Sequence, residues 1–190
     1  MRLIFGGFTV AFLTAVAAAQ APATRGLGTD PHVGPPSAAK PAGTLAQVMR
    51  GIYFPNANLI FDVQQNDPAT PKKKSDSGSS TDTYSAAYSG WEIVENAAVA
   101  LTDGVDLILK PGRTCQNGKP VPLNQPDFQK FAREMREAGR VALEAARTKN
   151  QEKASDATNN IADACSHCHE VYRDNGPADS PARCTPPPKK

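Results

Sequence analysis

The sequence predicts an all-α protein, an antiparallel four-helix bundle. Four segments carry apolar residues at the i, i+3, i+4, i+7 spacing of an amphipathic helix, and none alternates convincingly like a strand. Alanine is abundant, whereas aromatic residues make up only 6% of the 190 residues. This composition suits closely packed helices better than a β-sandwich. Four such helices, each with one apolar stripe, favour a bundle.

The first predicted helix starts at Thr44, which has the spacing of a capping box with Gln47. Pro55 should break or kink this helix before NANLIFDV continues it. Its apolar stripe consists of Leu45, Val48, Met49 and Ile52.

The second helix is predicted from about Tyr84 to Leu109, where the residues KPG at 110–112 stop it. The third follows Pro126, because proline is favoured in a first helical turn. The fourth is predicted from about Glu152 to Tyr172. The apolar stripe of the second helix consists of Trp91, Val94, Ala98, Leu101, Val105 and Ile108. That of the third consists of Phe128, Phe131, Met135, Ala138, Ala142 and Ala145. That of the fourth consists of Ala154, Ala157, Ile161, Ala164, Cys165, Cys168 and Tyr172.

Residues 1–19 predict a secretory signal peptide. Arg2 precedes an apolar stretch that reaches about Val16, and the alanines that end at Ala19 fit the A-x-A rule of signal peptidase. An uncleaved anchor is the alternative, but the apolar stretch is shorter than the roughly 20 residues of a spanning helix. No later stretch is long enough to span a membrane. We therefore expect export to a periplasm, with cleavage near Ala19.

Irregular stretches delimit a single helical domain at residues 44–174. Residues 20–43 are rich in Pro, Gly and Ala and should form a flexible leader, 64–83 an irregular loop within the domain, and 175–190 a proline-rich tail. Three consecutive lysines in the loop, at 72–74, could dock a partner but fit a solvated loop better. Loss of the signal peptide removes one basic residue from a net charge of +2, so charge predicts no nucleic-acid partner.

The residues CSHCH at 165–169 carry the chemistry of this chain. On a helix, Cys165 and Cys168 lie about 300° apart and share a face, and His169 follows about 100° further on. C-x-x-C-H is the attachment signature of c-type haem, in which two thioether bonds hold the haem and the histidine reaches its iron. His167 lies about 200° from His169 and is not counted as a ligand.

Two other kinds of site can contain a Cys-x-x-Cys pair. A thioredoxin-like pair should stand where a strand feeds a helix, and no strand is predicted here. A zinc site could use four sulfurs, from Cys165, Cys168, Cys115 and Cys184, but it needs reduced thiolates in an exported protein. A non-haem structural module held by zinc or by disulfides is the corresponding alternative function.

The chain resembles a known family. The stretches LAQVMRGI at 45–52, WEIVENAAVAL at 91–101 and ACSHCHEVYRD at 164–174 are similar to helices of the class II cytochromes c, the cytochrome c-prime group. The resemblance implies one covalent haem c, thioether-linked to Cys165 and Cys168. It also implies His169 as the proximal iron ligand and Met49 as the distal residue, although a methionine on an apolar stripe is also ordinary core filler.

These expectations lead to a periplasmic monohaem cytochrome that passes single electrons between redox partner proteins. It would not be an enzyme, since no catalytic constellation is evident in the sequence. A five-coordinate protein that binds nitric oxide or carbon monoxide is the alternative, and a dimer is compatible with either.

The cysteines that haem does not use, Cys115 and Cys184, are expected to form a disulfide in an oxidising compartment. The alternative is two free or intermolecular thiols. Arg50, Arg113 and Arg173 are candidates to pair with haem propionates, or are merely solvated.

Overall fold

The structure is a computed structural model that describes residues 39–70, 90–177 and 179–185. The predicted signal peptide, most of the leader, the lysines at 72–74 and the start of the second predicted helix lie outside these ranges. Residues 40–190 form one compact unit, which is described here by itself.

The regular structure in the described ranges is helical, apart from one isolated bridge between Thr114 and Pro120, so the all-α prediction is confirmed. No helix in this part of the chain combines the length and apolar character that crossing a membrane requires. The elements are α1 (Leu45–Val48), a π-helical turn η1 (Met49–Tyr53), α2 (Phe54–Phe61), a 3-10 turn η2 (Asp62–Gln64), α4 (Trp91–Asp103), α5 (Val105–Ile108), α6 (Pro126–Arg147) and α7 (Gln151–Tyr172).

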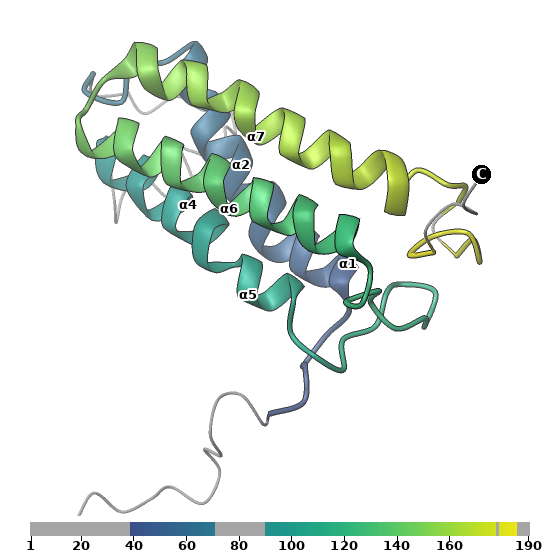
Figure 1. Cartoon of the computed structure of the whole chain (residues 1–190). Coiled ribbons are helices and arrows are strands. Elements are labelled where there is room, and N and C mark those ends of the chain that lie inside the picture. Colours follow the sequence, from purple (N-terminus) through teal and green to yellow (C-terminus); the bar gives the residue numbers. More distant parts are fainter. Residues whose placement is uncertain (1–38, 71–89, 178, 186–190) are drawn as a thin grey trace, which may run out of the picture. The chain divides into compact units, whose positions relative to one another are not determined.

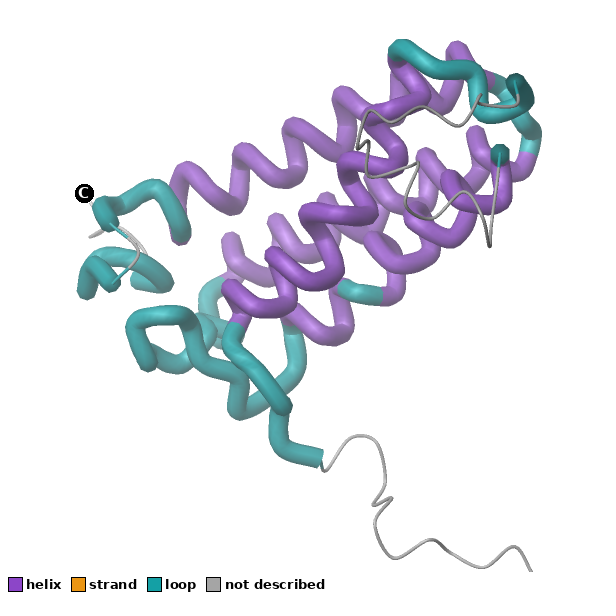
Figure 2. The backbone as a smooth tube through the Cα atoms, turned by 180° about the vertical axis from the view of Figure 1, so that it is seen from behind, coloured by secondary structure: helices purple, strands orange, loops and turns teal. Residues whose placement is uncertain are grey.

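The two longest helices, α6 and α7, lie side by side and run in opposite directions because residues 148–150 reverse the chain between them (Figure 1). Helix α4 packs against α6, and α2 packs against both α4 and α7. Seen from behind, α1, η1 and α2 follow one another as one continuous helical rod, residues 45–61, that crosses the other helices (Figure 2). This segment is called the α1–η1–α2 rod. Completely buried side chains at the centre come from α2, η2, α4, α5, α6 and α7, in that order Ile60, Val63, Leu101, Val105, Phe128 and Ile161.

The first predicted helix begins as expected but continues differently. Thr44 caps α1 with a complete capping box that involves Gln47. Of the two predicted effects of Pro55, a break or a kink, the break is wrong: the chain widens into the π turn η1 before Pro55 and continues as α2, with Pro55 in its first turn. A proline is tolerated there because the amide groups of a first turn donate few or no α-helical hydrogen bonds.

The second predicted helix is divided. Its part after Gly90 forms α4 and α5, which meet at Gly104. A β-carbon at position 104 would collide with the carbonyl oxygen of Ala100 and lie 3.1 Å from the hydroxyl of Tyr53. The position therefore has room only for glycine, which is also a poor helix former.

The C-terminal segment is held against the end of the helices. The structure contains the predicted disulfide between Cys115 and Cys184, whose Cα atoms lie 6.4 Å apart. The amide of Cys184 also donates to the carbonyl of Tyr172 at 2.9 Å, and Lys119 donates to the hydroxyl of Thr185 at 2.9 Å. Residues 179–185 are thereby fixed beside the end of α7, rather than forming only a loose tail.

Candidate cofactor site

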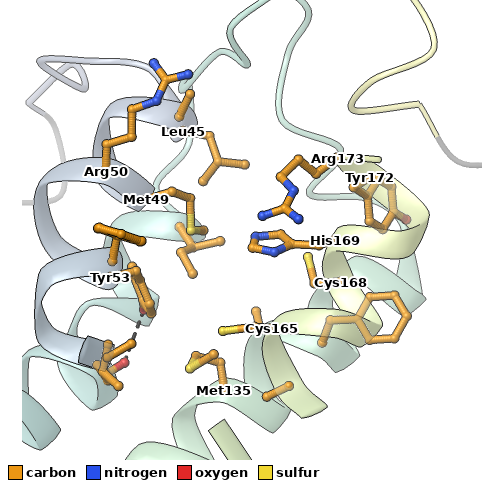
Figure 3. Close-up of a pocket in the computed structure, with 18 of the residues that line it drawn as sticks. Leu45, Met49, Arg50, Tyr53, Met135, Cys165, Cys168, His169, Tyr172 and Arg173 are labelled. Atoms are coloured by element: carbon orange, nitrogen blue, oxygen red, sulfur yellow. Dashed lines mark hydrogen bonds between the residues drawn. The ribbon is translucent and has the colours of Figure 1, made fainter. Parts of the chain in front are cut away.

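A cavity of about 460 Å³ lies between the α1–η1–α2 rod and helix α7, with α6 along one side (Figure 3). Its volume falls in the range of about 300–1,000 Å³ that is usual for small-molecule and cofactor sites. Most of its lining is apolar, and the aliphatic and aromatic part includes Leu45, Ala57, Phe61, Leu101, Ile108, Phe128, Phe131, Ala132 and Ile161.

Helix α7 presents the CxxCH motif to this cavity. Cys165, Cys168 and His169 all line it, and Figure 3 shows the two thiols and the imidazole pointing inward from one helix face. Both cysteines are free thiols. The three side chains therefore lie on the shared helix face that their spacing predicts.

The protonation of these groups follows from their surroundings. Burial raises the pKa of the Cys168 thiol to about 12, and it also raises the pKa of Cys165. Burial lowers the pKa of His169, and the nearby charge of Arg173 lowers it further. The imidazole is therefore neutral at neutral pH, which is the form that binds a metal.

The facing wall comes from the start of the rod. Met49 is the first residue of η1, lines the cavity and faces the side on which His169 lies (Figure 3). Tyr53 lies beside it and is 5% exposed, and its hydroxyl donates to the carbonyl of Leu101 at 3.1 Å. Met135, which was predicted only as part of the apolar stripe of α6, also lines the cavity, near Cys165.

The charged residues that line the cavity are three arginines, Arg50, Arg173 and Arg183, with no acid among the lining residues of the described chain. Arg50 donates to the side chain of Gln116 at 2.9 Å, and Arg173 pairs with Asp174 at 2.6 Å. Positive charge at the edge of an apolar cavity suits an amphipathic ligand that carries acidic groups.

Arg113 was expected to be either a propionate partner or solvated, and both expectations are wrong. Its side chain is buried away from the cavity and donates to the carbonyls of Leu107, at 2.7 Å, and Gly43. It therefore anchors the segment before α1 to the end of α5.

His167 points away from the cavity, as its helical position predicts. Its side chain is 56% exposed, and Nδ1 lies 3.2 Å from a carboxylate oxygen of Glu134 on α6. This histidine is thus a link between α6 and α7 on the outer surface.

The geometry weighs against the two rival chemistries. A redox-active Cys-x-x-Cys pair has a lowered thiol pKa, whereas burial raises the pKa of both Cys165 and Cys168. A zinc site with four sulfurs is contradicted, because Cys115 and Cys184 are bonded to each other. In the described residues, no three His, Cys, Asp or Glu side chains gather in a metal-binding group.

The same residues fit a haem. Two thiols and a neutral imidazole on one helix face are the donor set that a c-type haem requires. A methionine thioether on the facing wall is a soft sulfur ligand. The apolar cavity and its arginines match a largely apolar ring that carries carboxylates.

A helical protein with this site has the features of a c-type cytochrome. Residues 120–173 match the model of the family described as Cytochrome C', which confirms the resemblance to the cytochrome c-prime group. The matched segment holds α6 and α7, with the CxxCH motif, but not the wall that carries Met49. No curated protein and no solved structure matches the chain.

Proposed function

We propose that this protein is a periplasmic monohaem c-type cytochrome that carries single electrons. One observation carries the proposal: Cys165, Cys168 and His169 line one wall of an apolar cavity, and Met49 lies on the facing wall. In this proposal the two cysteines hold one haem c through thioether bonds. His169 and Met49 would ligate its iron.

The bound haem supplies the one-electron chemistry, and the chain supplies binding, orientation and shielding from water. Burial keeps His169 neutral and ready to ligate. The apolar lining excludes solvent, and a Met/His ligand pair raises the reduction potential, which suits an electron carrier. The chain's task is electron carriage between redox partner proteins rather than catalysis.

The proposal includes the arrangement of the helices around the haem. The α1–η1–α2 rod, the α4–α5 pair, α6 and α7 are the four members of an antiparallel four-helix bundle that encloses the haem. Arg50 and Arg183 would bind the propionates: both line the cavity, and among the described residues Arg50 donates to the side chain of Gln116 and Arg183 to the carbonyl of Gly176, rather than to a carboxylate.

Two further features support the proposed export of the protein. The sequence of residues 1–19 has the form of a signal peptide. The Cys115–Cys184 disulfide is of the kind that persists in an oxidising compartment. Thioether-bound cysteines would take no part in that disulfide chemistry.

The test is covalent haem. The full chain is produced in a host that has haem-maturation machinery, denatured, and then examined by in-gel haem staining and intact mass. We expect one haem per chain, weakened or abolished staining in Cys165→Ala and Cys168→Ala, and unchanged staining in Ser166→Ala, which lies between the two cysteines. Wild-type protein without covalent haem would contradict the proposal and favour a structural module held by its disulfide.

A further inference from the structure

The turn that begins with Met49 is unusual. Residues Met49–Tyr53 form a π turn, and the amide of Phe54 donates to the carbonyl of Met49, five residues earlier instead of four. Single π turns inside α-helices are rare and are often found at functional sites. Here the turn opens with the residue that lies across the cavity from His169.

Pro55 explains why the turn widens at this place. Proline has no amide hydrogen, so residue 55 cannot donate to the carbonyl of Gly51, four residues earlier. In a regular α-helix the proline ring would also collide with that carbonyl. A turn with one extra residue, placed directly before α2, avoids the collision without ending the helix.

The extra residue changes which side chains share a face. Val48 is 7% exposed and Tyr53 is 5% exposed, although they are five residues apart. In a continuous α-helix, residues five apart lie about 140° apart around the axis and cannot both face inward. After the turn, burial returns to α-helical spacing with Ala57 and Ile60. The cavity-lining side chains Met49, Tyr53, Ala57 and Phe61 recur every four residues, a series that drifts by about 40° at each step in a continuous α-helix and would place Met49 about 120° from Phe61. The wider π turn offsets part of this drift, so Met49 stays on the same side as the stripe of α2.

We propose that Pro55 is a positioning residue for the haem site: it fixes the π turn and thereby directs the Met49 sulfur into the cavity. The inference rests on the proposed function for its link to iron. Pro55 itself does not line the cavity, so it acts only through the register of the helix.

Two variants of the haem-loaded protein test this proposal. In Pro55→Ala the π turn can return to α-helical hydrogen bonds, which join residues four apart. The segment before residue 50 then rotates about the helix axis relative to α2. We expect the far-red sulfur-to-iron band of the oxidised protein to lose most of its intensity and the reduction potential to fall. Deleting Gly51 from this variant removes the extra residue and restores the common face. The band should then recover.

The controls separate register from helix stability. Gly51→Ala adds a β-carbon that meets nothing within 4 Å, and Pro126→Ala removes a proline from the first turn of α6. Both should keep the band. A full band in Pro55→Ala, or no recovery on deletion of Gly51, would overturn the role of Pro55.

A further measurement keeps this inference separate from the proposed ligation. In reduced protein labelled at the methionine methyl groups, a Met49 methyl above the haem ring has a strongly shifted resonance, whether or not its sulfur is bonded to iron. Met135→Leu assigns the two signals. If wild-type protein lacks the far-red band, the His/Met ligation is wrong. Loss of the methyl shift in Pro55→Ala would still support the positioning role, and an unchanged shift would overturn it.

Discussion

Tyr172 donates a hydrogen bond of 2.6 Å from its hydroxyl to Oδ1 of Asp127. The bond joins the last residue of α7 to the first turn of α6, and the Tyr172 ring packs edge to face against Phe128 with centroids 5.2 Å apart. Tyr172 also lines the cavity, three residues after His169. The contact therefore fixes the end of the helix segment that carries the CxxCH motif.

Tyr172→Phe keeps the aromatic packing and removes the hydroxyl. Hydrogen bonds to charged groups contribute about 1.5–3 kcal/mol, so we expect the free energy of unfolding to fall by roughly that amount. Urea unfolding monitored by circular dichroism measures it, with an unchanged denaturant slope as the sign of an unchanged unfolding reaction. Asp127→Asn, which keeps an acceptor oxygen, should cost less. Equal stability of Tyr172→Phe and wild type would show that the bond contributes nothing.

The same pair predicts a pH dependence. Burial, and then the hydrogen bond to Asp127, raises the pKa of Tyr172 above its ordinary value. The unfolded tyrosine ionises at about pH 10, before the folded one does. Its contribution to stability is therefore complete below pH 10 and is lost as the pH rises further. The difference in stability between wild type and Tyr172→Phe should be constant from neutral pH to about pH 10 and shrink above it.

The disulfide should stabilise the fold. Its cysteines are 69 residues apart, and chain-entropy reasoning for such a loop gives up to roughly 4 kcal/mol in an otherwise uncrosslinked chain. In the proposed haem-loaded protein the thioether bonds would already restrict the unfolded chain, so we expect a smaller loss in the Cys115→Ser/Cys184→Ser variant. Thiol labelling of denatured, unreduced wild-type monomer supplies the control. Two labelled cysteines would contradict the pairing.

Without haem the helices should be poorly ordered. The lining of the cavity is mostly apolar, and a bound haem would remove much of it from water. An alanine-rich bundle built around the ring loses that apolar burial when the ring is absent. Far-ultraviolet circular dichroism of Cys165→Ala/Cys168→Ala should show reduced helix and a broad melting transition. A sharp transition like that of wild type would show that the helices pack without haem.

Met49 decides between the two haem functions. If its sulfur binds iron, the oxidised protein is low-spin with a weak far-red band. Met49→Ala should then remove the band and give a high-spin site that binds carbon monoxide readily when reduced. Met135→Leu is the matched control, because Met135 lines the same cavity from α6. A wild-type spectrum that is already high-spin would favour the five-coordinate, gas-binding function.

The long helices could be predicted closely because local signals agree there. Pro126 begins α6 as expected, and α7 begins at Gln151, one residue before the predicted start. Both helices carry a regular apolar stripe, so the helical spacing of the apolar residues predicts which face is buried. The CxxCH motif is local as well, which is why its three side chains were placed correctly.

The rod and the division of the second helix could not be predicted from period alone. The buried stripe around Pro55 includes one five-residue step, which a search for α-helical spacing misses. Gly104 is required by the carbonyl oxygen of Ala100 and by the side chain of Tyr53, and the second of these lies 51 positions away in the sequence. The burial of Arg113 likewise depends on a distant carbonyl, that of Gly43.

The lining of the cavity shows the same limit. Tyr53, Met135 and Arg183 line it together with the motif, although nothing in the sequence near them indicates a ligand site. They meet only because helices from distant parts of the chain pack together. A residue's position on its own helix does not reveal which neighbour that face will meet.

The two walls of the cavity come from opposite ends of the described chain, with Met49 near its beginning and His169 near its end. In a chain that is exported N-terminus first, the thiols cross the membrane in the order Cys115, Cys165, Cys168, Cys184. Oxidation in order of arrival would join Cys115 to Cys165 and block haem attachment. For the proposed exported cytochrome, correct biogenesis would therefore require that the early thiol stay unpaired, or be released again, until the last cysteine has been translocated.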